Sequence, residues 1–239
     1  MSVLQCGRFR LDLSQPRVMA IINLTDDSFS GDGLRDDLAR ALARAERALE
    51  EGAEMLDIGA ESTRPGSDPV PEAQELERVV RFVEAARGWK VPLSIDTLKP
   101  TVMRAALAAG ADMINDINAF RASGAIEAVA AGESGLCVMH MLGQPRTMQQ
   151  DPRYADVVGE VTGFLDERVA ALVAAGVARE RIVLDPGFGF GKSVGHNYAL
   201  LRELARVGVG GLPVLAGLSR KSMLGAVTGR AVGERLAAS

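Results

Sequence analysis

The chain has 239 residues, of which 47% are hydrophobic and 26 are glycine, whereas aromatic residues make up only 4%. This length and composition suit one large core or two small ones in an α/β protein with glycine-rich turns. The formal net charge is -4, with both signs well mixed along the chain. Such a balance excludes the basic patch that proteins binding nucleic acid or anionic membranes usually carry.

The cysteines and the first residues bear on where the protein works. Cys6 and Cys137 lie far apart and neither belongs to a C-x-x-C motif, as expected for small residues in a reducing cytosol. The opening MSVLQCGRFRLDL lacks the basic and then apolar pattern of a secretory signal, and no apolar run has the length of a membrane span. We therefore expect a cytoplasmic protein with no membrane and no nucleic-acid partner.

Seven short apolar runs, each bounded by turn residues, recur along the chain. Each run is almost continuously hydrophobic, as expected of parallel strands that are covered on both faces. In chain order, the predicted strands span residues 17–23, 54–60, 92–97, 113–118, 136–141, 182–188 and 213–219.

Helical patterns separate the predicted strands. In the first of them, apolar residues repeat at steps of three and four, with Asp36 or Asp37 as the expected N-cap and Gly52 as the expected stop. Strands that alternate with helices predict a parallel sheet with helical crossovers. No low-complexity linker divides the chain, so we expect one domain over residues 1–239. The predicted helices between the first four strands span residues 36–53, 71–88 and 99–111.

Polar residues stand at or near the carboxyl ends of different predicted strands. In an open doubly wound sheet, ligand contacts would gather near one switch point instead. In a (β/α)8 barrel, all strand ends meet around one mouth, where catalytic groups gather. The pattern therefore predicts a (β/α)8 TIM barrel. The polar residues are Asn23, Asp57, Asp96, Asn115, Asp116, His140, Asp185 and Ser219.

The eighth strand of such a barrel is missing from the sequence. After Ser219 the chain continues as RKSMLGAVTGRAVGERLAAS, without another β-type run. An unclosed barrel would expose two long strand edges, which favour aggregation. We therefore expect the chain to be a C-terminally incomplete copy of the barrel domain, with further residues after Ser239.

The stretch DPGFGFGKSVGHN, residues 185–197, resembles a nucleotide-binding loop at first sight. A phosphate-binding G-x-x-x-x-G-K-[ST] loop would need glycine where this chain has Pro186. A dinucleotide G-x-G-x-x-G motif that began at Gly187 would need glycine where the chain has Lys192. The spacing therefore excludes both kinds of nucleotide loop.

Asp96, Asn115 and Asp185 are expected to face the same pocket. An acidic residue inside an apolar barrel is unfavourable unless a partner offsets its charge. Carboxylates and an amide around one cavity suit a flat heterocycle with adjacent ring N–H and amino groups, such as a pterin or a guanine edge. The alternative for each residue is to cap a nearby helix or to bond a loop backbone.

Two lysines and two long loops extend the predicted mouth. Lys192 and Lys221 follow the last two predicted strands, where barrels often bind phosphate. Lys221 is the stronger candidate because it begins a predicted helix, whose free N–H groups favour anions; a solvated surface position is the alternative. The glycine-rich loops 23–33 and 61–70 suit lids or binding elements, and Phe29 either covers a flat ligand or anchors its loop.

His140 and Asn23 are candidates for a base and a metal ligand. A lone histidine at a strand end is more often a hydrogen-bonded structural residue than a general base. No His or Cys cluster has the spacing of a zinc site. A Mg²⁺ ion held mainly by substrate phosphates and water needs only one or two protein oxygens, and Asn23 is able to provide one.

Seven motifs occur in register and in order from about residue 16 to the final residue. Together they make the chain resemble the dihydropteroate synthases, a pterin-binding TIM-barrel family of folate biosynthesis and the target of sulfonamides. The motifs are NLTDDSFSGDG, DIGAESTRPG, SIDT, INDI, MHMLGQPRTMQ, DPGFGFGK and GLSRKS.

The resemblance implies a transferase (EC 2.5.1.15) that condenses 6-hydroxymethyl-7,8-dihydropterin diphosphate with p-aminobenzoate. It also implies a role for each matching position, with Asp96 and Lys221 as catalytic residues and Asn23 as the ligand of Mg²⁺. The pterin site would comprise Asp96, Asn115, Met139, Asp185 and Lys221. The p-aminobenzoate site would comprise Phe29, Thr63, Arg64, Pro65, Phe190 and Ser222.

Two departures from the family pattern leave alternatives open. Asp26 stands where the family usually has proline, and the chain stops before the Arg-x-His motif that the family carries on its eighth strand. A pterin-binding methyltransferase barrel and a catalytically degenerate pterin-binding protein are the rival readings. Members of the family tend to form homodimers, although no apolar stripe in this sequence shows it.

Overall fold

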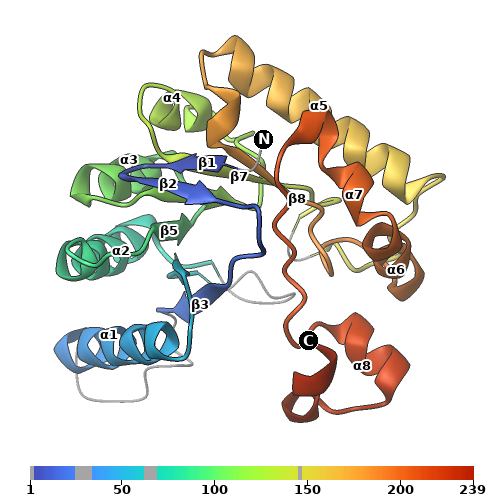
Figure 1. The fold of residues 1–239 in the computed structure, drawn as a ribbon, viewed down its shortest axis with the longest axis horizontal. Coiled ribbons are helices and arrows are strands. Elements are labelled where there is room, and N and C mark those ends of the chain that lie inside the picture. The colour runs from blue at the N-terminus through green and yellow to red at the C-terminus, as the bar shows by residue number, and fades with distance from the viewer. Residues whose placement is uncertain (1–2, 25–33, 62–68, 145–146) are drawn as a thin grey trace.

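The computed structural model describes residues 3–24, 34–61, 69–144 and 147–239, with the side chains of residues 34–37 left aside. Its main sheet has six parallel strands in the order β3-β4-β5-β6-β7-β8, so each strand pairs with the next one along the chain. Helices pack around the outside of this sheet (Figure 1). The strands are β3 (Met19–Asn23), β4 (Met55–Gly59), β5 (Leu93–Asp96), β6 (Met113–Asp116), β7 (Gly135–Met139) and β8 (Ile182–Asp185). The helices are α1 (Leu34–Glu50), α2 (Glu72–Ala86), α3 (Pro100–Ala109), α4 (Ala125–Val129), α5 (Val157–Ala174), α6 (Val194–Arg202), α7 (Leu204–Val207) and α8 (Ser222–Thr228), with 3-10 turns at Arg179–Arg181, Val209–Gly211, Val232–Glu234 and Leu236–Ala238.

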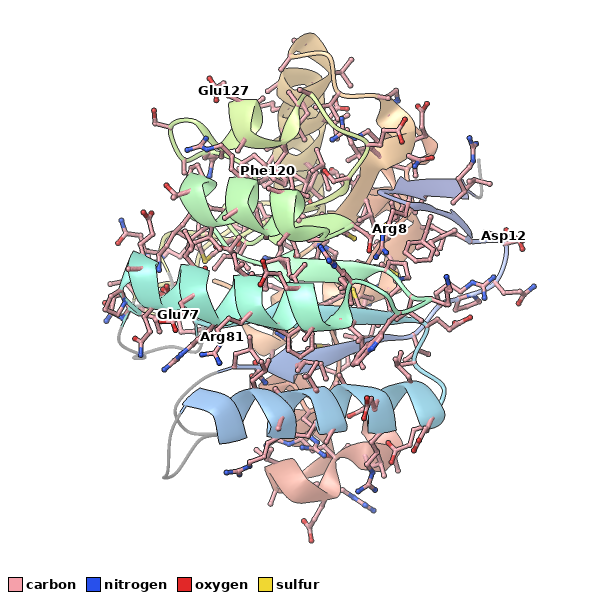
Figure 2. All side chains as sticks on the ribbon, turned by 90° about the vertical axis from the view of Figure 1, so that its left-hand side faces the viewer. Arg8, Asp12, Glu77, Arg81, Phe120 and Glu127 are labelled. Atoms are coloured by element: carbon pink, nitrogen blue, oxygen red, sulfur yellow. The ribbon has the colours of Figure 1, made fainter. Side chains whose placement is uncertain are left out.

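Most strands of the sheet are buried on both faces, as their apolar runs predict, whereas the edge strand β3 is partly exposed. Every residue of β4, β6, β7 and β8 is buried, and the core between sheet and helices contains the buried rings of Phe82, Phe120 and Phe188. Figure 2 shows α1 to α4 side by side in front of the sheet, with Glu77 and Arg81 on the outer side of α2. Their ion pair of 3.5 Å is partly exposed, so the polar stripe of this helix faces water.

The predicted helices are present, with one shifted boundary. Helix α3 begins at Pro100 and ends before Gly110, whose φ of 115° only glycine adopts readily. Helix α1 likewise ends before Gly52, which has a φ of 106°. It begins at Leu34, however, ahead of the predicted caps Asp36 and Asp37. Those two residues therefore lie within the first turn of α1 and not at its cap.

An antiparallel hairpin that the sequence pattern did not predict precedes the sheet. It consists of β1 (Val3–Cys6) and β2 (Phe9–Asp12). Leu4 and Cys6 pack against residues at or near the amino ends of β4, β6, β7 and β8. The guanidinium of Arg8, labelled in Figure 2, donates to both carboxylate oxygens of the buried Asp112 at 2.9 Å. The hairpin therefore covers the end of the sheet opposite to the predicted mouth.

The seventh predicted strand, residues 213–219, forms only an isolated bridge. Val214 pairs in parallel with Leu184, and two backbone hydrogen bonds flank the bridge, from Leu184 N–H to Pro213 O and from Leu215 N–H to Leu184 O. Proline offers no N–H to a ladder, and glycine follows at 217, so the pairing stays short. In the described part of the chain, β3 pairs with β4 alone and the sheet does not close into a complete barrel.

Both cysteines are fully buried and unpaired. Cys6 and Cys137 pack in the same small cluster between the hairpin and the sheet. Burial raises the pKa of Cys6 to about 12 and the pKa of Cys137 well above its ordinary value. Among the described residues, no helix is both long enough and apolar enough to cross a membrane.

Candidate active site

The carboxyl ends of four neighbouring strands bring three predicted site residues into one row. Asn23 lies opposite Gly59, Gly59 opposite Asp96, and Asp96 opposite Asn115. Asn115 is buried, Asp96 is partly buried and Asn23 is exposed. Because Gly59 has no side chain, the space in front of the Asp96 carboxylate stays open: a Cβ there would lie 3.5 Å from its Oδ2. The register therefore places these polar groups at one end of the sheet.

A buried hydrogen-bond network extends from this row toward the sheet interior. Asp57 accepts from Ser94 Oγ at 2.7 Å and from Asn115 Nδ2 at 3.0 Å. Burial raises the pKa of Asp57, and the two hydrogen bonds oppose that effect. The other side-chain atom of Asn115, Oδ1, is buried and has no hydrogen-bond partner among the described residues. Since an unpaired buried acceptor is unfavourable, Asn115 Oδ1 fits an N–H donor of a bound ligand.

Asp96 lines a small cavity in surroundings that disfavour its charged form. Burial is the main reason that its pKa lies well above its ordinary value, and nearby carboxylates, led by Asp57 and Asp116, raise the pKa further. Several negative groups around one space attract cationic or N–H-rich ligands. The cavity is lined by Glu61, Glu75, Asp96, Leu98 and Ile117.

Asp185 and Lys221 bring opposite charges to the same region. Asp185 ends β8, accepts from the Gly187 N–H at 2.6 Å, and has its pKa raised to about 6, chiefly by burial. Burial also lowers the pKa of Lys221, whereas the charges of Asp185 and Asp96 raise it. Lys221 is therefore a cation within electrostatic reach of two predicted site carboxylates.

Phe190 and Met139 form the apolar side of this region. The Lys221 Nζ lies 4.5 Å from the centroid of the Phe190 ring, a cation–π contact. Met139, at the end of β7, is buried in a small cluster with Ile117, against which Phe190 packs. The 187–190 turn thus brings an aromatic ring next to a lysine and a methionine, an arrangement suited to a flat ligand.

Lys192 is not at the mouth, where the sequence pattern places it. It is 3% exposed, and its Nζ contacts His140 Nδ1 at 2.9 Å and the carbonyl oxygens of Gly187 and Phe190 at 3.0 Å. Burial lowers the pKa of Lys192 to about 7. Burial and, next, the Lys192 charge lower the pKa of His140 to about 3. The structure thus corrects the prediction for Lys192, and it favours the structural alternative for His140.

Of the remaining residues predicted for the p-aminobenzoate site, the structure describes only Ser222. Ser222 is exposed and begins α8, directly after Lys221. Phe29, Thr63, Arg64 and Pro65 lie outside the described residues.

A partly buried ionic cluster beside Asp96 escaped prediction. Lys99 Nζ forms ion pairs with Glu61 and Glu75 and donates to the Val70 carbonyl at 2.8 Å. Its members are scattered over two loops and the first turn of α2, so no motif announces the cluster. Asp57 is visible in the sequence as an acidic residue within an apolar strand, but its hydrogen bonds to Ser94 and Asn115 depend on sheet register.

Comparison of the sequence with known proteins finds relatives whose activities are assigned. The profile of the family described as pterin binding enzyme matches residues 19–239. The dihydropteroate synthase of Haemophilus influenzae (strain Rd) is 50% identical over 230 residues, which cover 96% of this chain and 84% of that protein. The dihydropteroate synthase of Escherichia coli K12 is 46% identical, with coverage of 96% and 82%.

Solved structures share the fold and show which ligands those proteins bind. Burkholderia cenocepacia dihydropteroate synthase in complex with 7,8-dihydropteroate superposes with a TM-score of 0.89 at 58% identity, covering 100% of this chain and 84% of that chain. The Xanthomonas albilineans enzyme with 4-aminobenzoic acid gives a TM-score of 0.92 at 49% identity, with coverage of 100% and 86%. The Yersinia pestis enzyme in a sulfonamide complex gives 0.92 at 45%, with coverage of 99% and 86%. The (β/α)8 prediction is thereby confirmed at the level of fold class, and this chain belongs to the pterin-binding enzyme family and, within it, to the dihydropteroate synthases.

Proposed function

We propose that this chain catalyses the condensation of 6-hydroxymethyl-7,8-dihydropterin diphosphate with p-aminobenzoate. The products are 7,8-dihydropteroate and diphosphate, and the reaction is a step of folate biosynthesis. Family membership supports the reaction, and one observation supports its location: Asn115 Oδ1 is a buried acceptor without a partner, next to carboxylates at the strand ends. A pterin presents adjacent ring N–H and amino donors that match such acceptors.

Recognition of the pterin rests on acceptors from three strands. Asn115 on β6 offers Oδ1, while its Nδ2 is held by Asp57 at 3.0 Å and so fixes the amide orientation. Asp185 on β8 offers a buried carboxylate. Asp96 on β5 lies opposite Asn115 in the sheet, and Met139 lies beside Asp185 at the end of β7. In this arrangement the polar edge of the ring meets fixed acceptors and its face meets a thioether.

The chemical step requires stabilisation of charge but no side-chain nucleophile. The bond between the pterin methylene carbon and the diphosphate oxygen breaks, and its electron pair leaves with the diphosphate. A positive charge develops on the pterin methylene; this charge and that of Lys221 favour the ionised form of Asp96, whose carboxylate stabilises the cation. The amine nitrogen of p-aminobenzoate then donates its lone pair to that carbon and releases a proton to solvent. Holding the weakly basic amine in line contributes more than removing its proton beforehand.

A magnesium ion fits the leaving-group side of this proposal. Asn23 ends β3 with an exposed amide side chain, whose hard oxygen suits Mg²⁺. The described residues contain no group of three or more His, Cys, Asp or Glu side chains able to hold a metal, so substrate phosphates and water would complete the coordination. When bound, the ion would neutralise charge on the departing diphosphate. Lys221 adds a cationic side chain to the same mouth.

The p-aminobenzoate site is proposed on the outer side of the pterin. Phe190 and Ser222 are its described members, and both neighbour Lys221 in space or in sequence. Phe29, Thr63, Arg64 and Pro65 complete the proposed set from the two long loops.

The proposal has three further parts: residues 1–239 form one barrel domain, the protein is a homodimer, and its location is cytoplasmic. Analytical ultracentrifugation tests the dimer.

Product formation from purified substrates tests the reaction itself. Dihydropteroate should form, with release of diphosphate, only when the pterin diphosphate and p-aminobenzoate are both present. A sulfonamide should raise the apparent KM for p-aminobenzoate without changing the maximal rate. A methyltransferase barrel or a degenerate binding protein would bind pterin but form no dihydropteroate.

Two substitutions test the assigned residues. Asp96→Ala and Lys221→Ala should each lower kcat by about 100-fold or more, because each removes electrostatic stabilisation in the mouth. Asp166→Ala and Lys90→Ala, both at exposed positions, serve as matched controls and should keep the wild-type rate. Steady-state kinetics on the folded variants measures kcat. A normal kcat in Asp96→Ala would remove that residue from the mechanism.

A further inference from the structure

The buried Lys192 has hydrogen-bond partners but no ion-pair partner in the described part of the chain. Its Nζ lies 2.9 Å from His140 Nδ1, 3.0 Å from Gly187 O, 3.0 Å from Phe190 O and 3.3 Å from His140 O. Burying an ammonium group is unfavourable unless its donors are satisfied. The Nζ of Lys192 therefore links acceptors of the turn 187–191 to acceptors of His140.

An ammonium group on Lys192 accounts for these contacts. Three carbonyl oxygens, from His140, Gly187 and Phe190, surround the Nζ and can only accept, and an ammonium group has three N–H donors and no lone pair. Beside a charged Lys192, His140 Nδ1 can act only as an acceptor. With Lys192 charged, the imidazole is neutral and carries its proton on Nε2.

We propose that Lys192 is a positioning residue, whose buried ammonium group fastens the turn 187–191 to the end of β7 and thereby fixes Asp185 and Phe190 for the substrates. This inference rests on the proposed function, because it takes those two residues as substrate contacts. It assigns no contact between Lys192 and either substrate.

Both backbone polar groups of Gly187 take part in this positioning. Its N–H donates to Asp185 Oδ1 at 2.6 Å, and its carbonyl accepts from Lys192 at 3.0 Å. The Asp185 carbonyl in turn accepts from the His140 N–H at 3.0 Å. Lys192 is thus linked to the Asp185 carboxylate through the single residue Gly187, and a backbone hydrogen bond joins Asp185 to His140 directly.

The same ammonium group holds the aromatic ring of the turn. It binds the Phe190 carbonyl, while the Phe190 ring lies under Lys221. Gly191 is fixed from the other side, because the Tyr154 hydroxyl donates to its carbonyl at 2.8 Å. The His140 ring is packed edge-on against Phe164 at 5.0 Å between centroids, so this partner of Lys192 cannot swing away freely.

Lys192→Met tests the proposal, since methionine fills a similar volume without donors. The KM for p-aminobenzoate and the dissociation constant of the pterin diphosphate should both rise about tenfold or more, because small displacements of positioned groups are costly. Lys90→Met, at an exposed position near the start of β5, is the matched control and should change neither value. A folded Lys192→Met protein with wild-type values of both constants overturns the proposal.

Nuclear magnetic resonance of the histidines gives a test that needs no activity. The chain has only two histidines, and His196→Gln assigns their signals. In the wild-type protein, the ¹⁵N shifts should show His140 with its proton on Nε2, and Lys192→Met should raise the pKa of His140. A proton on Nδ1 in the wild type overturns the proposal even if Lys192→Met does not fold. Absence of dihydropteroate synthesis with the expected Nε2 tautomer would instead refute the proposed function and leave only the contacts of Lys192 with the turn 187–191 and His140 supported.

Discussion

Asp185 illustrates how a buried carboxylate, proposed to bind the pterin, lowers stability. Its folded-state pKa of about 6 is raised above the ordinary value of 3.8, so folding favours the protonated form. The associated stabilisation is fully present below about pH 4 and is lost as the pH rises through 6. Asp185→Asn keeps an acceptor for the Gly187 N–H and removes the ionisation. We expect this variant to be more stable than the wild type at pH 7.5 by a few kcal/mol, as about 1.4 kcal/mol corresponds to each pKa unit.

Urea unfolding at pH 4 and pH 7.5 checks this expectation. The advantage of Asp185→Asn should shrink toward zero at the lower pH, and its affinity for the pterin should fall at pH 7.5. Asp166→Asn, on the exposed side of α5, is the control and should follow the wild type at both values. An advantage that is equal at both pH values would show that ionisation of Asp185 is not its source.

Gly187 is the residue in the glycine-rich turn that tolerates substitution least. Its φ is 66°, and a Cβ at this position would lie 2.0 Å from the His140 carbonyl oxygen. Gly187→Ala should therefore lower the free energy of unfolding by about 3 kcal/mol or more, because backbone strain and overpacking act together. Gly163→Ala, in the middle of α5 with open space around it, should raise stability by about 0.5–1 kcal/mol. Thermal unfolding of both variants provides the comparison. Equal changes in stability for Gly187→Ala and Gly163→Ala would contradict the close approach of Gly187 to the His140 carbonyl.

At the scale of elements, the β1–β2 hairpin depends on one buried carboxylate. Asp112 is 1% exposed and accepts from the Arg8 backbone N–H, the Arg8 guanidinium and the Leu93 N–H. Asp112→Ala leaves the Leu93 donor buried without its acceptor and frees the hairpin. We expect a loss of about 1–3 kcal/mol in the free energy of unfolding and faster cleavage by protease within residues 3–12.

Asp12→Ala provides the control for this experiment. Asp12 ends the same hairpin but is exposed, and among the described residues its carboxylate accepts hydrogen bonds from Ser14 alone. Its removal should change stability by less than about 0.5 kcal/mol, as is usual for surface positions. If Asp112→Ala lowered the free energy of unfolding by as little as Asp12→Ala, the hairpin would be held by its apolar side chains and not by the Asp112 carboxylate.

Strands and helices with strong periodicity were predictable, and segments that depend on distant partners were not. The run 113–118 contains β6, because a continuously apolar run is buried on both faces. Pro100 and Gly110 mark the ends of α3, because each restricts the backbone locally. The run 213–219 is apolar as well, yet it forms only the bridge at Val214. The hairpin escaped prediction for the opposite reason, since its short alternating strands are stabilised by contacts with residues around a hundred positions away.

At the scale of the whole molecule, the sequence predicted which strand ends carry polar groups but not how those groups bind one another. Parallel order alone brings Asp96 and Asn115 to one edge. The bond from Asn115 to Asp57, in contrast, depends on register between strands that are not adjacent, and the burial of Lys192 depends on how the 187–191 turn folds over β7. The functional assignment succeeded through seven motifs, whereas a single motif such as GFGFGK placed its lysine wrongly.

The two cysteines have a practical consequence for measuring motion. Reaction with maleimide requires a thiolate, and in both Cys6 and Cys137 burial raises the pKa and shields the sulfur from reagents. The two native cysteines should therefore not react with thiol-labelling reagents in the folded protein. A fluorophore or spin label attached at one introduced cysteine, for example through Asp166→Cys on α5, would report from that point alone, without first rebuilding the apolar cluster beneath the sheet.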